Sequence, residues 1–327
     1  MNEQPPRRRG RLLTLVLLLA LPVGGLTQAQ RIQDAIRLAG YEAPAEVAQL
    51  ARETSMSNEG EKLFYVNHPI VANRASFNQY CRSRGEQTIV LGCYHGKDRG
   101  IYLFDVNDPR LTGVEQVTAA HEMLHAAYDR LSRSERTRID GLLQDYYKTK
   151  VTDQRLRETI AAYEKSEPND VVNEMHSIFA TEVAELPAEL ETYYTRYFVN
   201  RKQVVAYADR YQQEFTARRD QVAGYDRRLS ALRESMNANR TALDRQEVEI
   251  VAERQRLEEL RQAGEVGAYN ASVVGFNTRI ERYNALIATT QAQVREYNEI
   301  VGIRNSLALE VKELAASINS NLTPLQQ

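Results

Sequence analysis

The sequence predicts an α+β fold, in which a small sheet and several helices precede a long antiparallel coiled-coil hairpin. Short runs rich in aromatic and β-branched residues, typical of strands, occur in the first third of the chain. Helix-capping patterns dominate the middle, and apolar residues recur every seven positions toward the C-terminus. The 327 residues include only 16 Gly and 9 Pro, which favours long helices over a turn-rich β fold.

Three runs predict the strands of the sheet: residues 63–66, 88–91 and 101–106. The second and third runs flank residues 96–100, whose Gly-Lys-Asp-Arg-Gly sequence suits the turn of a β-hairpin. We therefore expect a sheet of about three strands, with a hairpin at its C-terminal end.

Helix-start signals are found on both sides of these runs. Thr112 and Glu115 have capping-box spacing, in which a Thr oxygen and a Glu carboxylate satisfy backbone N–H groups at the first turn. Ser132 and Glu135 repeat the pattern. The expected helices are 32–39, one after Pro44, 113–130, 132–148, 155–165, 170–185 and one after Pro187.

The C-terminal part contains two heptad arms, separated by a break near Gly264 and Gly267. The apolar positions are Phe215, Val222, Leu229, Met236, Leu243, Ile250 and Leu257, then Val273, Ile280, Ile287, Val294 and Val301. An arm over residues 200–262 would extend about 90 Å, too long for part of a compact enzyme domain. The hairpin is thus expected to act as a spacer, a partner-docking rod or an oligomerisation element; the alternative is a hairpin that serves only its own stability.

The N-terminus has the pattern of an export signal. Four arginines between residues 7 and 11 precede an uncharged, Leu-rich run at 12–29. Cleavage after Ala29 fits this segment, as does retention as a membrane anchor with the arginines in the cytoplasm. An extracytoplasmic protein is expected, periplasmic or secreted, attached to the membrane if the segment is uncleaved. The formal net charge of −2 gives no electrostatic reason to expect nucleic-acid binding.

Cys81 and Cys93 are the only two cysteines. In an oxidising compartment an even pair commonly forms a disulfide, and two unpaired buried thiols are the alternative. No Cys-x-x-Cys spacing is present, so the sequence does not support a thiolate metal site or a dithiol redox motif.

The motif His121-Glu122-Met123-Leu124-His125 carries the strongest chemical signal. On a helix, histidines four residues apart lie on one face and can hold one Zn²⁺, with Glu122 beside the metal's open position. Such a site lowers the pKa of a bound water, and the glutamate accepts its proton during attack on a carbonyl. The alternative is a pair of ordinary core histidines.

A hydrolytic zinc site with two histidines needs a third protein ligand. The segment Asn173-Glu174-Met175-His176-Ser177 offers Glu174 and His176, which point about 200° apart on a helix, so only one can face the metal. Glu182 is a third candidate for this role.

The two motifs together resemble those of the gluzincins, the thermolysin-like zinc metallopeptidases. The resemblance implies a zincin-like catalytic domain in which His121, His125 and Glu174 bind Zn²⁺ and Glu122 is the general base. It covers about residues 101–185 and departs from the family pattern at Ile178, where members commonly carry an Asp that orients a ligand histidine. The spacing between the motifs is also longer than in well-known members.

Two supporting roles of this family have no assigned residue in the sequence. Groups that orient the ligand imidazoles are sought among Asp129, Thr181 and Glu182. Donors to the oxyanion are sought among Tyr128, Tyr146, Tyr147 and His68, none of them favoured by spacing. His68 and His95 are otherwise expected to be turn or surface residues.

The expected organisation is an export segment or anchor at 1–29, a metallopeptidase domain at 30–199 and the coiled-coil hairpin at 200–327. The expected partners are a peptide or protein substrate and, through the hairpin, an envelope protein or a second copy. An extended substrate is expected to pair with a sheet edge, for which the hairpin at 88–106 is the candidate. The rival function is an envelope scaffold or regulator with a structural or vestigial zinc site.

Overall fold

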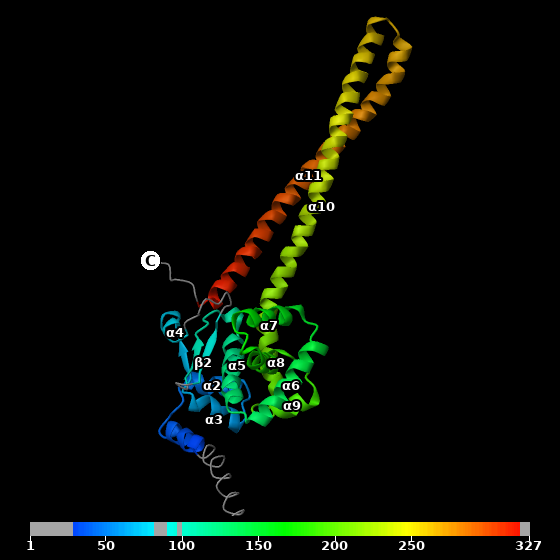
Figure 1. The fold of residues 1–327 in the computed structure, drawn as a ribbon. Coiled ribbons are helices and arrows are strands. Elements are labelled where there is room, and N and C mark those ends of the chain that lie inside the picture. Colours follow the sequence, from blue (N-terminus) through cyan, green and yellow to red (C-terminus); the bar gives the residue numbers. More distant parts are fainter. Residues whose placement is uncertain (1–28, 82–89, 97–99, 321–327) are drawn as a thin grey trace, which may run out of the picture. The chain divides into compact units, whose positions relative to one another are not determined.

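A computed structural model describes residues 29–81, 90–96 and 100–320 of the chain (Figure 1). The chain divides into two compact units. Unit 1 runs to Tyr211 and includes the chain from Ser317 onward, and unit 2 is Gln212–Ala316. The expected export segment lies outside the described residues except for Ala29. Within the described part, no helix combines the length and apolarity needed to cross a membrane.

The first helices of unit 1 partly match expectation. A helix at 29–38 ends before Gly40, which has a φ of 74°, and α2 (Ala45–Glu53) follows Pro44 as predicted. The strand predicted at 63–66 is wrong, because these residues form the end of α3 (Asn58–Val66). Ser57 caps this helix by accepting a hydrogen bond from the Gly60 N–H. A four-residue apolar run does not distinguish a strand from a buried helix turn.

The sheet has three strands, β1 (Ile70–Ala72), β2 (Gly92–His95) and β3 (Gly100–Phe104), in the order β1-β3-β2. β1 is parallel to β3 and β2 is antiparallel to it. The strand predicted at 101–106 is confirmed over residues 101–104, and it ends two residues earlier than predicted. The strand predicted at 88–91 lies later in the chain, at 92–95. Residues 88–89 and 97–99 lie outside the described residues. The short helix α4 (Arg74–Tyr80) joins β1 to the segment before β2.

The helices after the sheet follow the predicted order, after a short 3₁₀ turn, η1. The Ser132 cap is confirmed, since its hydroxyl accepts a hydrogen bond from the Glu135 N–H at 3.3 Å. The elements are η1 (Pro109–Leu111), α5 (Val114–Asp129), α6 (Arg133–Thr149), α7 (Gln154–Ser166), α8 (Val171–Glu182) and α9 (Ala188–Tyr194).

The capping box predicted at Thr112 and Glu115 is wrong. The Thr112 hydroxyl donates to the Pro109 carbonyl oxygen, and Glu115 accepts from the Val106 N–H. Gly113 precedes α5 with a φ of 114°, and a Cβ there would lie 2.6 Å from the Tyr207 carbonyl oxygen. The chain therefore enters α5 through a glycine that permits this close approach, instead of through a side-chain cap.

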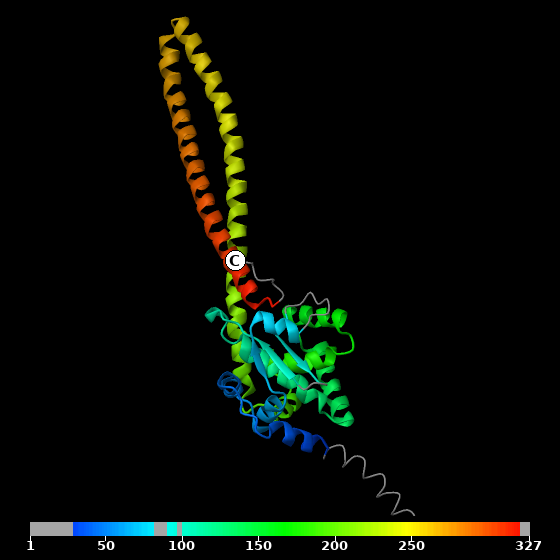
Figure 2. The same cartoon turned by 90° about the vertical axis from the view of Figure 1, so that its left-hand side faces the viewer.

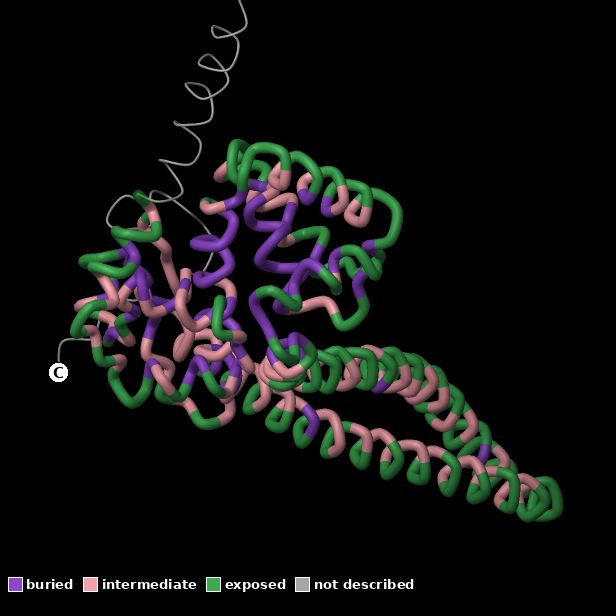
Figure 3. The backbone as a smooth tube through the Cα atoms, turned by 90° about the horizontal axis from the view of Figure 1, so that it is seen from below, coloured by how far each residue is buried: buried purple, intermediate pink, exposed green. Residues whose placement is uncertain are grey.

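The core of unit 1 is centred on α5, which packs against α8, α2, α3, β2 and β3. Figure 3 shows long stretches of buried backbone in this unit and only scattered buried residues along the two long helices. The start of α10 also belongs to the core, because Val204, Val205 and Ala208 are buried. The central helix of the fold is thus the helix that carries the His-Glu-x-x-His motif.

Unit 2 consists of most of two long helices, α10 (Arg201–Gln262) and α11 (Val266–Ile318), which lie side by side in both views (Figures 1 and 2). They are antiparallel, because Arg218 pairs with Glu310 and Arg279 with Glu249. The predicted helical hairpin is therefore present. Its apolar stripe departs from the prediction in α11, where Val294 is 44% exposed.

Candidate functional site

The imidazoles of His121 and His125 converge on the carboxylate of Glu174. The two histidines lie one turn apart on α5, and Glu174 lies in the first turns of α8. His121 Nε2 is 3.4 Å from Glu174 Oε2, and His125 Nε2 is 3.4 Å from Glu174 Oε1. The packing of α5 against α8 therefore brings together two motifs that are far apart in the sequence.

Burial makes this convergence of charge expensive unless another group compensates for it. Glu174 is 6% exposed, and its Oε2 has no hydrogen-bond partner among the described residues. Burial raises the pKa of Glu174, but the neighbouring His125 and His121 outweigh it and lower the pKa below its ordinary value. Burial likewise opposes the charged form of His121, whereas the Glu174 carboxylate raises the pKa of His121 to about 9. Each group thus depends electrostatically on the other.

The donor set fits a divalent metal ion. Each of the three residues offers one ligand atom, and these atoms lie within 4.8 Å of one another. Two imidazole nitrogens and one carboxylate oxygen are the ligands of hydrolytic Zn²⁺ sites, which leave a fourth position open. A cation between them would also coordinate Glu174 Oε2, which accepts no hydrogen bond from the described residues. Glu167 and Asp170 come similarly close to Glu174, as carboxylates only.

Asn173 orients one of the imidazoles. Its Oδ1 lies 3.0 Å from His125 Nδ1, and its Nδ2 donates to Asp170 Oδ1 at 3.1 Å. Because an amide oxygen can only accept, this hydrogen bond selects the neutral form of His125 that carries its proton on Nδ1, in which the lone pair on Nε2 faces Glu174. This role was expected of Asp129, Thr181 or Glu182. The available signal was the position of Asn173 next to the ligand candidate.

The residues expected to orient an imidazole make other contacts, although Glu182 also lines the cavity. The Thr181 hydroxyl donates to the Ser177 carbonyl oxygen, and Glu182 pairs with Arg155 at 2.6 Å. Asp129 lies at the rim of the cavity, close to Gly96.

His176 lies apart from the group. It is fully buried, and its Nε2 is 2.9 Å from the Tyr193 hydroxyl. Burial, helped by the charges of His125 and His121, lowers the pKa of His176 to about 3. The ring packs among Tyr128, Tyr193 and Tyr194. The opposite directions expected for residues 174 and 176 on one helix are therefore observed.

Glu122 faces the same cavity as the two histidines. It is 5% exposed, and burial raises its pKa, against the lowering effect of the two imidazoles. The cavity has a volume of about 530 Å³. One wall is the chain from Val90 to Gly96, which includes all of β2, and the other walls come from α5, α7, α8 and the first turns of α10.

The oxyanion donors expected from the sequence, three tyrosines and His68, do not line this cavity. Tyr128 donates to Asp140 at 2.8 Å, Tyr146 to the Glu185 carbonyl oxygen at 3.2 Å, and His68 Nε2 lies 2.8 Å from the Arg37 carbonyl oxygen. Tyr147 packs under Arg157. The residues that do line the cavity and that were not expected from the sequence include Tyr94, His95, Tyr163 and Tyr211.

Tyr163 reaches the candidate ligand directly, because its hydrogen bond to Glu174 lowers the pKa of that carboxyl. His95 is the last residue of β2, and its Nε2 is 2.9 Å from the Tyr80 carbonyl oxygen. No pattern in the sequence distinguishes these residues, since tertiary packing alone brings them to the cavity.

The predicted disulfide between Cys81 and Cys93 is present. It joins the end of α4 to β2, and both cysteines line the cavity. The bridge therefore lies in the wall of the candidate site.

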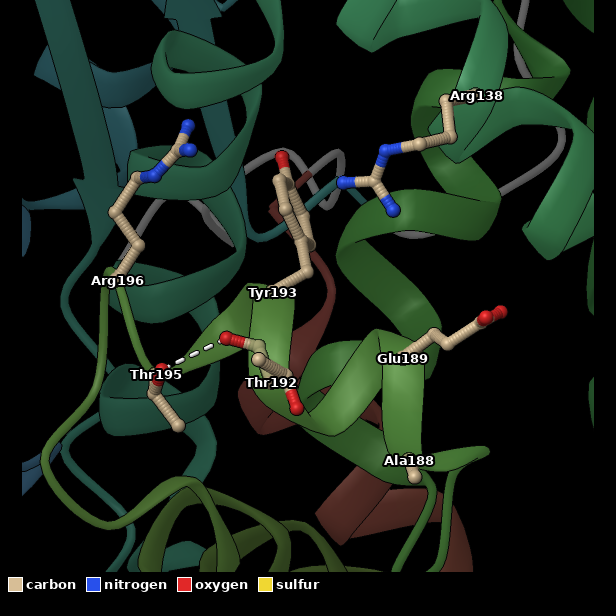
Figure 4. A pocket seen from close by; sticks show the side chains of 7 residues that line it. All are labelled: Arg138, Ala188, Glu189, Thr192, Tyr193, Thr195 and Arg196. Carbon is tan, nitrogen blue, oxygen red and sulfur yellow. Dashed lines mark hydrogen bonds between the residues drawn. The ribbon is translucent and has the colours of Figure 1, made fainter.

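A second cavity, of about 560 Å³, lies over α6 and α9 (Figure 4). Its lining contains no histidine, and the Thr195 hydroxyl donates to the Thr192 carbonyl oxygen at 2.7 Å. Tyr193, which also contacts His176, is the link between this cavity and α8. The metal-capable group therefore belongs to the first cavity alone.

Comparisons with known proteins give no relative. No protein-family model matches the chain, no curated protein matches it, and no solved structure matches it.

Proposed function

We propose that the protein is an exported zinc-dependent metallopeptidase that resembles the gluzincins. The observation that carries the proposal is the convergence of His121, His125 and Glu174 at 3.4 Å, beside Glu122 and inside a cavity. The proposal includes a zincin-like catalytic domain formed by unit 1. It also includes an extracytoplasmic location, for which the support is the sequence pattern at residues 7–29.

In the proposed reaction, different residues bind the metal, transfer the proton and orient a ligand. His121, His125 and Glu174 would hold Zn²⁺, which when bound supplies a Lewis acid for the scissile carbonyl. Glu122 accepts the proton of the attacking water and passes it to the leaving amine. Asn173 fixes the ring of His125 in the tautomer that leaves Nε2 free for coordination.

Substrate would enter along β2. This strand ends the order β1-β3-β2, so one of its sides has no strand partner among the described residues, and all four of its residues line the cavity. An extended peptide adds to such an edge through main-chain hydrogen bonds, while pockets select side chains. A peptide or protein substrate is therefore the proposed ligand.

Zinc content tests the ligand set. The full chain without its export segment, and the variants His121→Ala, Glu174→Ala and Glu182→Ala, are measured by elemental analysis after dialysis. We expect about one zinc per chain in the wild type and in Glu182→Ala, and strong loss in the other two. Zinc retained in Glu174→Ala would move the third ligand to another carboxylate that lines the cavity, such as Glu182.

Hydrolysis of an unstructured protein tests the reaction. Glu122→Gln should bind zinc as the wild type does and lose hydrolysis, because the amide cannot accept the proton. Undiminished hydrolysis in this variant would refute the assignment. Zinc binding without hydrolysis in the wild type would favour the rival function, an envelope scaffold that recruits a partner through its helical hairpin.

A further inference from the structure

The backbone of β2 lies directly against the side chain of Glu122. A Cβ added at Gly92 would lie 2.7 Å from both Cγ and Oε1 of Glu122, and 2.6 Å from Thr118 Cγ2. Such distances are far below van der Waals contact, so only glycine fits at this position without displacement of a neighbour. Gly92 thus forms one side of the space that Glu122 occupies.

Of the two crowded neighbours, Glu122 is the one free to move. Thr118 is β-branched and buried, and its hydroxyl donates to the Val114 carbonyl oxygen at 2.8 Å, which fixes its rotamer. Glu122 has a longer chain whose carboxylate faces the cavity. A larger residue at position 92 would therefore displace the carboxylate.

Covalent and polar contacts hold this part of β2 in place. Cys93, the next residue, is bonded to Cys81. On the other side, the Val90 carbonyl oxygen accepts from the Ser320 hydroxyl at 2.6 Å, and the Leu91 carbonyl oxygen accepts from the Phe104 N–H at 2.8 Å. Among these contacts of the described residues, the disulfide is the covalent cross-link.

We propose that Gly92 is a positioning residue for Glu122, and that the Cys81–Cys93 disulfide holds Gly92 in its working position. This inference rests on the proposed function, in which Glu122 is the general base. It adds a form of regulation: the chain reaches full activity only after the disulfide forms, so activity is low in a reducing compartment and rises after export.

The first test replaces Gly92 by Ala in the full chain, with Gly141→Ala as the matched control. Gly141 lies in α6 with nothing within 4 Å of an added Cβ. Gly92→Ala should lower kcat about tenfold or more with zinc content unchanged and a smaller change in KM, because a small misplacement of a catalytic group costs mainly rate. Gly141→Ala should be as active as the wild type. An unchanged kcat in Gly92→Ala would overturn the positioning role.

The second test works even if Gly92→Ala fails to fold. A water-soluble phosphine reduces the wild-type disulfide: the S–S bond breaks, the phosphorus takes the oxygen of one water molecule, and the two sulfurs take its hydrogens. We expect kcat to fall several-fold while zinc stays bound, and to return on reoxidation. The variant with Cys81→Ser and Cys93→Ser should show the same low kcat and no further response to the phosphine.

The outcomes separate this inference from the proposed function. Full activity in the reduced wild type and in the double serine variant would overturn the role of the disulfide while leaving the peptidase assignment intact. An oxidised, zinc-loaded wild type that hydrolyses nothing would overturn the proposed function, and the inference with it.

Discussion

At the scale of single residues, the hydrogen bond between Asn173 and His125 decides how the candidate ligands are presented. The Asn173 amide is 8% exposed and is itself fixed by Asp170, so its oxygen can point only toward the imidazole. A proton held on Nδ1 leaves Nε2 as the lone pair that faces Glu174. A ring free to rotate would spend part of its time in orientations that cannot bind a metal.

Asn173→Ala should therefore weaken zinc binding by about 10- to 100-fold without removing a ligand. Competition with a chelator of known affinity measures the change. The matched control is Asn237→Ala, an exposed position in α10 that should bind zinc as the wild type does. Equal zinc affinity in Asn173→Ala and the wild type would show that packing alone orients His125.

The sequence predicts those parts of the site that depend on local spacing. His121 and His125 share a face because they lie four residues apart on a helix, and this spacing holds in α5. Tyr163 and Tyr211 could not be predicted, because α7 and α10 reach the cavity only through the folding of the whole unit. Asn173 is an intermediate case. The sequence places it next to the ligand candidate Glu174, but it does not predict the hydrogen bond to His125.

At the scale of elements, Arg201 connects α10 to the end of α8. It is 6% exposed, and its guanidinium donates to the carbonyl oxygens of Ala180 at 3.0 Å and Val183 at 2.6 Å. It also pairs with Glu191 in α9. The last carbonyl groups of a helix lack partners within it, so this buried arginine satisfies groups that would otherwise be exposed or unpaired.

Arg201→Lys should destabilise unit 1 by about 1–3 kcal/mol, because an ammonium cannot reproduce the planar fork and leaves carbonyl groups at the end of α8 without a donor. Chemical denaturation followed by circular dichroism measures the change. Arg219→Lys, an exposed position on α10, is the control and should change stability little. A loss below about 1 kcal/mol in Arg201→Lys would mean that water replaces these contacts.

Asp108 makes the stability of unit 1 depend on pH near the point where α11 ends. Its side chain accepts from the Arg110 N–H and pairs with the Arg110 guanidinium, and it also accepts from the Ser317 hydroxyl at 3.2 Å. The hydrogen bond from the Arg110 side chain is the largest cause that lowers the pKa of Asp108, from 3.8 to about 2.

Because the folded state holds the charged form more strongly, the stabilising contribution of Asp108 is complete above about pH 4 and is lost as pH falls toward 2. Asp108→Asn should therefore be less stable than the wild type at pH 6, and the difference should shrink at pH 2. Denaturation curves at the two pH values check this. A constant difference would assign the effect to packing instead of charge.

The elements themselves were predicted unevenly, for a physical reason. Helices with several turns, such as α6 and α7, can be predicted because they have a capping residue and a repeated apolar spacing. The strand β1 has only three residues, and the run at 63–66 belongs to a helix. Short buried segments carry too few positions for a period to be read, so their structure is set by what they pack against.

At the scale of the whole molecule, unit 1 is formed by two separate stretches of the chain, one before and one after the helical hairpin. Residues 201–211 of α10 belong to unit 1, where Val204 and Val205 are buried and Tyr211 lines the cavity. The chain from Ser317 belongs to it as well, and Ser320 bonds to Val90 in the cavity wall. Unit 2 is therefore an insertion in unit 1, and not a C-terminal addition to it.

Two deletions distinguish an insertion from an addition. Removing residues 200–327 takes away Arg201, the buried valines and Tyr211, so this truncated chain should be unstable and inactive. Replacing Gln212–Ala316 by a flexible Gly/Ser linker keeps both attachments and should retain the fold, one zinc and hydrolysis of an unstructured peptide. Thermal unfolding, zinc content and peptide hydrolysis are measured on both chains.

If the truncated chain were as stable and active as the linker chain, the ends of the hairpin would contribute nothing to unit 1. If the linker chain folded and bound zinc but lost activity, the hairpin would be needed for catalysis itself.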